Sequence, residues 1–239
     1  MRLILALLVA ALALPARAET VRPLARPTFD PIPVTRWDHR DEAGRWSRAA
    51  LQALRNHGEP LVEMEPEDMA RWCPGYAGAP PDARRAFWVG FLSALAHYES
   101  THKPRAVGGG GKWFGLLQIA PATARGYECR AGSGEALKDG PANLSCAIRI
   151  MAETVPRDGV IHAREPRWSG VSADWGPMRS STKRAAMRNW LRGQDYCQLH
   201  VSMRPRLRPK PDSHIMGPIR PALRPAPRLA TAVGPTAPL

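Results

Sequence analysis

Proline-rich segments at both ends of this 239-residue chain limit where a packed domain can form. Proline lacks a backbone donor and fixes φ, so segments dense in it resist regular structure. Four prolines fall within residues 19–36 and nine follow His200, whereas all eight tryptophans lie between these segments. We therefore predict a flexible lead-in at 19–36 and a single domain at 37–200, about 160 residues long.

The segment at 201–239 carries seven Arg or Lys residues and almost no aromatic or acidic ones. This composition is typical of a disordered basic tail. Two interpretations stay open, a solvated appendage and a loose tether to an anionic envelope polymer.

Residues 1–18 have the pattern of a signal peptide. Arg2 precedes the apolar run "LILALLVAALAL", and the small-residue pattern "ARA" ends at Ala18. The run has 12 residues, and a membrane-spanning helix needs about 20. We expect cleavage near Ala18, a periplasmic or secreted protein and no membrane anchor.

The net charge is +13, and removing Arg2 and Arg17 leaves +11. Such a chain is attracted to polyanions. Because export separates it from nucleic acid, we expect no nucleic-acid partner and interpret the charge as solubility plus attraction to the cell envelope.

The four cysteines form an even set without C-x-x-C spacing, which in an exported chain indicates two disulfides. Three pairings are possible. We favour Cys129 with Cys146, which closes a local loop, and Cys73 with Cys197, which joins the start of the domain to its end.

Strand signals are scarce, and helical spacing of apolar residues recurs, so the domain is predicted to be mainly α-helical. Long loops are expected at 105–118 and 156–180. The expected helices fall within residues 44–58, 81–100, 121–127 and 141–155.

The stretch "AHYESTHKP" at 96–104 concentrates polar residues at a predicted helix end. His97 and His102 are five residues apart, about 140° around a helix, so they do not share one metal ion as a helical H-E-x-x-H pair would. We predict no metal site here and interpret both as surface histidines.

Glu99 is the unusual member of that stretch. It lies about 20° around the helix from Trp88 and so continues the apolar face. A carboxylate there is either a buried structural acceptor or the floor of a cleft. The helix C-terminus and apolar neighbours both disfavour its charged form, so we expect a raised pKa, which suits a general acid.

Four motifs together resemble the lytic transglycosylases of the soluble 70-kDa type. They are "ESTHKP" from Glu99, "GLLQI" from Gly115, "PATA" from Pro121 and "NL" from Asn143, in the family's order and spacing. The resemblance covers residues 82–151 best. It implies a goose-type lysozyme fold for the single domain with disulfides predicted above, and peptidoglycan glycan strands as substrate.

The resemblance also implies roles for individual residues. Glu99 would be the single catalytic acid and later base, with Ser100 as a polar helper. Gln118 and the backbone around Gly115 and Leu116 would line the sugar cleft, which Asn143 would help to hold. The family cleaves the bond between N-acetylmuramic acid and N-acetylglucosamine without water and leaves a 1,6-anhydro end, with no cofactor.

Two departures from the family pattern leave choices open. The run "GGGGKWF" is longer than usual, so Trp113 is either a sugar-stacking platform or a core residue. The family's A-Y-N motif is absent, and Trp175 is our choice for the substrate contact in its place, with Tyr196 second.

Two other functions remain in view. A muramidase of the same fold would need a second carboxylate, for which Asp174 and Asp139 are candidates, since most glycosidases use a pair. A non-catalytic glycan-binding module is the other. We expect a monomer that has, at most, an envelope-assembly protein as partner.

Overall fold

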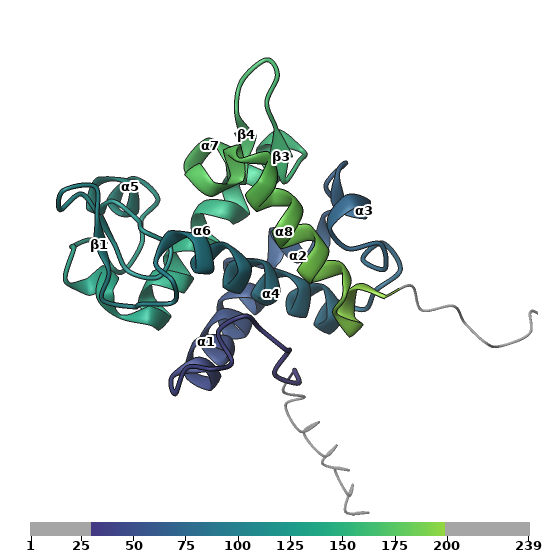
Figure 1. The fold of residues 1–239 in the computed structure, drawn as a ribbon, viewed down its shortest axis with the longest axis horizontal. Helices are drawn as coiled ribbons and strands as arrows, with labels where there is room; N and C mark the ends of the chain where they lie inside the picture. Colours follow the sequence, from purple (N-terminus) through teal and green to yellow (C-terminus); the bar gives the residue numbers. More distant parts are fainter. Residues whose placement is uncertain (1–29, 199–239) are drawn as a thin grey trace, which may run out of the picture. The chain divides into compact units, whose positions relative to one another are not determined.

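The computed structural model describes residues 30–198, which form a mainly α-helical domain (Figure 1). The predicted signal peptide, residues 19–29 of the lead-in and the tail at 201–239 lie outside the described residues. In chain order the elements are α1 (Ala43–Arg55), α2 (Glu59–Glu63), α3 (Met69–Trp72), α4 (Pro81–Glu99), β1 (Val107–Gly108), β2 (Trp113–Phe114), α5 (Pro121–Gly126), η1 (Ala136–Lys138), α6 (Gly140–Asp158), β3 (His162–Ala163), β4 (Ser169–Gly170), α7 (Val171–Asp174), η2 (Gly176–Arg179), α8 (Ser181–Arg192) and η3 (Asp195–Cys197).

Helix α4 is the centre of the domain, and α1, α2, α8, η2 and η3 pack against it (Figure 1). It begins at Pro81, whose fixed φ suits a first helical turn, with Asp82 in that turn. Every residue from Phe87 to Ala96 is buried, so this part of α4 is buried on all sides. The sequence predicted the helix but interpreted it as one-faced, which is wrong, because neighbouring elements surround it.

Helix α6 forms the second long element and packs against α1, α2 and η1. Asp139 caps its start by accepting a hydrogen bond from the Ala142 N–H at 3.0 Å. Gly159, at φ 72°, ends it in the left-handed conformation that favours glycine. The helix extends past the predicted end at 155 and includes Pro156.

The two predicted loops contain short antiparallel hairpins. β1 pairs with β2 within residues 105–118, and β3 pairs with β4 within 156–180, each strand only two residues long. The second loop region also contains α7 and η2.

Both favoured disulfides are present, Cys73 with Cys197 and Cys129 with Cys146. The first joins the segment after α3 to the last described turn. The second joins the loop after α5 to α6. The predicted pairing is therefore confirmed.

Residues 30–36 of the lead-in are held on the domain by Asp30. Its carboxylate is only 6% exposed and lies 2.6 Å from Arg85 Nε on α4 and 2.8 Å from Arg55 Nη2 on α1. Burial alone would raise the pKa of Asp30, but these two guanidinium groups hold it down to about 2. This part of the Pro-rich segment is thus fixed, where the sequence suggested flexibility.

Within residues 30–198, no helix combines the length and the apolar character needed to cross a membrane.

Candidate active site

Glu99 is the last residue of α4 and is half-buried. Among residues 30–198, no group donates a hydrogen bond to its carboxylate or forms an ion pair with it. Loss of hydration on burial raises the pKa of Glu99 to about 7, and the ammonium of Lys183 opposes that rise. The direction of this shift agrees with the sequence prediction.

The chain turns sharply after Glu99. The Ser100 N–H and hydroxyl both donate to the Ala96 carbonyl, at 3.0 and 3.3 Å, so Ser100 closes the helix and is buried. Thr101 and His102 follow with φ of 52° and 59°. This turn leaves Glu99 at the open end of α4.

His102 is buried, which contradicts its interpretation as a surface residue. It is 2% exposed, and its Nε2 lies 3.0 Å from the Ser93 carbonyl, to which it donates. Its ring packs beside Trp37, His39 and His97. It therefore fastens the turn after Glu99 back onto α4.

The "GLLQI" loop is attached to the segment that follows this turn. The Gly115 N–H donates to the Ala106 carbonyl at 2.9 Å, and Gln118 Nε2 lies 3.3 Å from the same oxygen. Gln118 Nε2 also donates to the Gly115 carbonyl at 2.8 Å. These bonds fix the loop relative to the chain that leaves Glu99.

Asn143 supports the "GLLQI" loop through its side-chain hydrogen bonds. It is fully buried, its Oδ1 accepts from the Leu117 N–H at 2.8 Å, and its Nδ2 donates to the carbonyls of Phe114 and Leu137 at 2.9 and 3.0 Å. The side chain thus satisfies the Leu117 N–H and the Leu137 carbonyl, while the Phe114 carbonyl also accepts from the Ile119 N–H at 3.0 Å. Its role in the structure is to support the loop.

Gly115 is required by both its backbone and its surroundings. Its φ is 82°, and an added Cβ would lie 2.1 Å from the Leu137 carbonyl and 2.3 Å from Asn143 Nδ2. Leu116 beside it is fully buried, so only its backbone is available to line a cleft.

A small pocket of about 70 Å³ gathers three of the predicted residues, Trp113, Gln118 and Trp175, together with Asp174. Trp113 is 47% exposed, so the choice left open by the sequence is settled against a core position. Trp175 is 4% exposed, and its indole N–H donates to the Leu117 carbonyl at 2.9 Å. Trp175 therefore anchors the loop as well as lining the pocket.

The glycine run before Trp113 makes room for these side chains. A Cβ on Gly108 would lie 2.2 Å from Gln118 Oε1, and one on Gly109 would lie 2.3 Å from the Trp113 ring. Gly108 and Gly109 are thereby explained, because larger residues at these two positions would displace the amide and the indole. Gly110 and Gly111 meet no such neighbour, but their φ angles of 65° and 91° favour glycine.

Glu99 itself does not line this pocket, and two connections link its surroundings to the pocket. The loop is bonded to Ala106, seven residues beyond Glu99. Helix α4 also packs against η2, which begins directly after Trp175.

The two candidate second carboxylates differ. Asp139 caps α6 and pairs with Arg45 at 3.0 Å, so its carboxylate has a structural role. Asp174 lines the pocket, where partial loss of hydration raises the pKa of its carboxyl, and the guanidinium of Arg157 opposes that rise.

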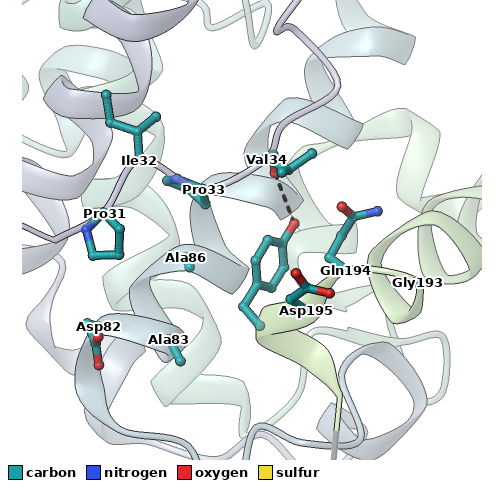
Figure 2. A pocket seen from close by; sticks show the side chains of 11 residues that line it. Pro31, Ile32, Pro33, Val34, Asp82, Ala83, Ala86, Gly193, Gln194 and Asp195 are labelled. Carbon is teal, nitrogen blue, oxygen red and sulfur yellow. Dashed lines mark hydrogen bonds between the residues drawn. The ribbon is translucent and has the colours of Figure 1, made fainter.

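Tyr196, the second choice for the missing A-Y-N tyrosine, lies elsewhere. It lines a pocket of about 370 Å³ beside Asp82 and Ala86 in the first half of α4, and its hydroxyl donates to the Val34 carbonyl at 3.4 Å (Figure 2). A Cβ on Gly90 of α4 would lie 2.1 Å from the Tyr196 hydroxyl, and Gly90 is nine residues before Glu99, about 13 Å along the helix. Tyr196 is thus wrong as a substrate contact beside Glu99.

Lys183 is the residue that sequence reasoning missed. It stands in the first turn of α8. Its ammonium lies 5.6 Å from the centre of the ring of Tyr98, the residue that precedes Glu99 in the chain. No sequence motif indicates it, since only the packing of α8 on α4 brings the two together.

The fold and these motif residues define a lysozyme-like domain. Residues 81–161 match the family described as the Transglycosylase SLT domain, a span from the start of α4 to just past α6 that includes all four motifs. The resemblance to lytic transglycosylases is confirmed, and with it the expected lysozyme-like, mainly α-helical fold. The activity of that family is of the lytic transglycosylase type on peptidoglycan.

Solved structures of the protein DslA (Bd0314) share the fold. A glutamate-to-glutamine mutant of it is 28% identical, with a TM-score of 0.64, and the alignment covers 72% of this chain and 100% of that chain. The wild-type form 2 gives the same identity and TM-score over 70% of this chain and 100% of that chain. No curated protein matches the chain in sequence.

Proposed function

We propose that the protein is a peptidoglycan lytic transglycosylase in which Glu99 acts alone as acid and then base. The observation that carries the proposal is a half-buried carboxyl with a pKa of about 7 and no hydrogen-bond partner within residues 30–198. A general acid is most effective when its pKa lies near the working pH, because it then holds a proton and still releases it readily.

In the first step, Glu99 donates its proton to the oxygen between N-acetylmuramic acid and N-acetylglucosamine, and the bond from that oxygen to C1 breaks. The N-acetylglucosamine portion leaves with the proton on its new hydroxyl. The resulting Glu99 carboxylate then accepts the proton of the muramyl C6 hydroxyl, whose oxygen bonds to C1. The product is a 1,6-anhydro ring, and Glu99 is again protonated.

The surroundings of Glu99 suit this single-carboxylate chemistry. The nucleophile belongs to the substrate, so a second carboxylate is unnecessary. Trp113 offers an exposed ring on which a sugar can pack, and Gln118 offers an amide at the same pocket. Ser100 and Asn143 support the site from the interior through their backbone contacts.

Hydrolysis by the same fold is the second candidate, and Asp174 is the observation that favours it. This carboxylate faces the pocket of Trp113 and Gln118, where it would be able to activate a water molecule. We propose that either reaction takes place in the periplasm or outside the cell. In both cases the protein would act on glycan strands as a monomer.

The test uses purified peptidoglycan and three variants. Glu99→Gln should release no muropeptides while still pelleting with the wall, because the amide keeps the shape of the side chain but has no proton to give. Asp174→Asn should retain release if the proposal is right. Glu63→Gln, at an exposed glutamate on α2, is the control for the change in charge.

Retained cleavage by Glu99→Gln would overturn the assignment of the acid. Abolition by Asp174→Asn would favour hydrolysis with two carboxylates. Wall pelleting without release by the unmodified protein would indicate a binding module.

A further inference from the structure

A second pocket, of about 510 Å³, lies between α1 and α6 and shares no lining residue with the pocket of Trp113 and Gln118. Its size falls within the range of small-molecule sites. Polar and apolar groups share its lining, and the polar ones include the side chains of Arg130, Arg149, His57 and Asp139.

The two arginines of this pocket have no anionic partner in the described chain. No carboxylate of residues 30–198 lies within ion-pair distance of Arg130 or Arg149. The carboxylate of Asp139 is already paired with Arg45 at 3.0 Å and capped by the Ala142 N–H. The walls therefore carry uncompensated positive charge.

The disulfide between Cys129 and Cys146 holds these charges together. Arg130 directly follows Cys129, whose Cα lies 5.2 Å from that of Cys146. Arg149 is three residues beyond Cys146 on α6, one helical turn away and on the same face. The cross-link thus fixes the backbone that carries both arginines at the rim of one pocket, which both side chains line.

His57 contributes to the inner wall of the pocket. Its Nε2 lies 2.9 Å from the Ser145 carbonyl, and because a carbonyl only accepts, Nε2 carries the proton. The imidazole is thereby fixed in position between α1 and α6.

We propose that this pocket binds a phosphate group, carried by a small sugar or glycerol unit. Each guanidinium donates two parallel hydrogen bonds to a phosphate, whose oxygens point in several directions and so engage two arginines at once. A carboxylate has only two oxygens and is satisfied by one arginine. The pocket has space beyond the phosphate for the group that carries it.

Calorimetric titration of the full chain with inorganic phosphate and with glycerol 3-phosphate tests this, at constant ionic strength. We expect binding that weakens at least tenfold in Arg130→Gln and in Arg149→Gln. Arg192→Gln, at an exposed arginine on α8 outside the pocket, is the matched control and should bind like the unmodified protein. Acetate should bind far more weakly than phosphate.

Arg149 is half-buried, so its replacement by glutamine could disturb folding. The melting temperature of each variant detects such a defect, and Arg149→Lys is a milder replacement. The lysine keeps the charge but loses the paired donors, and should weaken binding. Co-sedimentation with phosphatidylglycerol vesicles, against phosphatidylcholine vesicles, tells a lipid headgroup from a soluble phosphate. The proposal would be overturned if all variants bound phosphate with the affinity of the unmodified protein, or if Arg192→Gln lost as much affinity as the pocket variants. Binding of acetate as tight as that of phosphate would overturn it as well.

Discussion

Replacing Glu99 with glutamine should stabilise the protein above neutral pH, without reference to any substrate. The pKa of Glu99 is raised from its ordinary value of 4.5 to about 7, mainly because burial penalises the charged form. The folded protein therefore keeps its proton over a range of pH in which the unfolded chain has lost it. The stability cost is absent below pH 4.5, grows between 4.5 and about 7, and is complete above 7.

The magnitude follows from the size of that difference. At about 1.4 kcal/mol for each pH unit, a rise from 4.5 to about 7 costs about 3 kcal/mol of unfolding free energy. Glutamine has nearly the same shape and no charge, so Glu99→Gln should recover about 3 kcal/mol at pH 8 and almost nothing at pH 4. For a domain of this size that gain raises the melting temperature by roughly 6–12 °C.

Thermal unfolding of both proteins from pH 4 to pH 8 measures this. Glu63→Gln at the exposed end of α2 corrects for the general change in net charge. A difference between Glu99→Gln and the unmodified protein that stays flat with pH would refute the reasoning. An equal gain in Glu63→Gln would refute it as well.

Three further predictions concern Lys183, Asn143 and Trp113. Because the Lys183 ammonium lowers the pKa of Glu99, Lys183→Met should move the alkaline limb of the kcat/KM profile to higher pH, and Lys183→Arg should leave it nearly in place. An unmoved limb in Lys183→Met would show that this cation does not act on the acid. Asn143→Ala should lower the unfolding free energy by about 3 kcal/mol in denaturant titrations, because the Leu117 N–H and the Leu137 carbonyl lose their partner and the Phe114 carbonyl loses one of two. A loss under about 1 kcal/mol would contradict its supporting role. Trp113→Ala should raise KM for glycan strands about tenfold, or about 1.4 kcal/mol. The melting temperature should not change, because the ring is exposed. A large fall in melting temperature with an unchanged KM would instead make Trp113 a structural residue.

The long helices and the disulfides were predictable because their signals are local or few. Apolar content and a proline at the first position mark α4, and four cysteines in an exported chain allow only three pairings. Helix α8 was not predicted. Only Met187 and Leu191 of it are buried, so its apolar periodicity is too weak to recognise. The hairpins were not predicted for a similar reason, because a two-residue strand is too short to show the alternation of apolar and polar residues that marks a strand.

The sequence identified the motif residues of the site, but it did not indicate which residues or backbone groups they contact. Glu99, Gln118 and Asn143 stand in recognisable patterns, but the patterns do not tell a side chain that faces a pocket from one that supports a loop. Asn143 and Trp175 both proved to donate to or accept from loop backbone. Lys183 lies on a helix far along the chain, so its nearness to Glu99 depends wholly on tertiary packing.

The burial of His102 has the same origin. Its neighbours in sequence are polar, and only the left-handed turn at Thr101 and His102 directs the ring back toward Ser93. A sequence pattern does not predict such a turn in residues other than glycine, because non-glycine residues seldom adopt it.

The mass of the released glycan ends tests the central claim most directly. If Glu99 passes the muramyl C6 proton and the substrate supplies the nucleophile, digestion of purified peptidoglycan yields 1,6-anhydro-muramyl ends, each lighter by one water than a reducing end, and Glu99→Gln yields none. Release of reducing ends by the unmodified protein would contradict the account, because water, and not the C6 hydroxyl, would then have attacked C1.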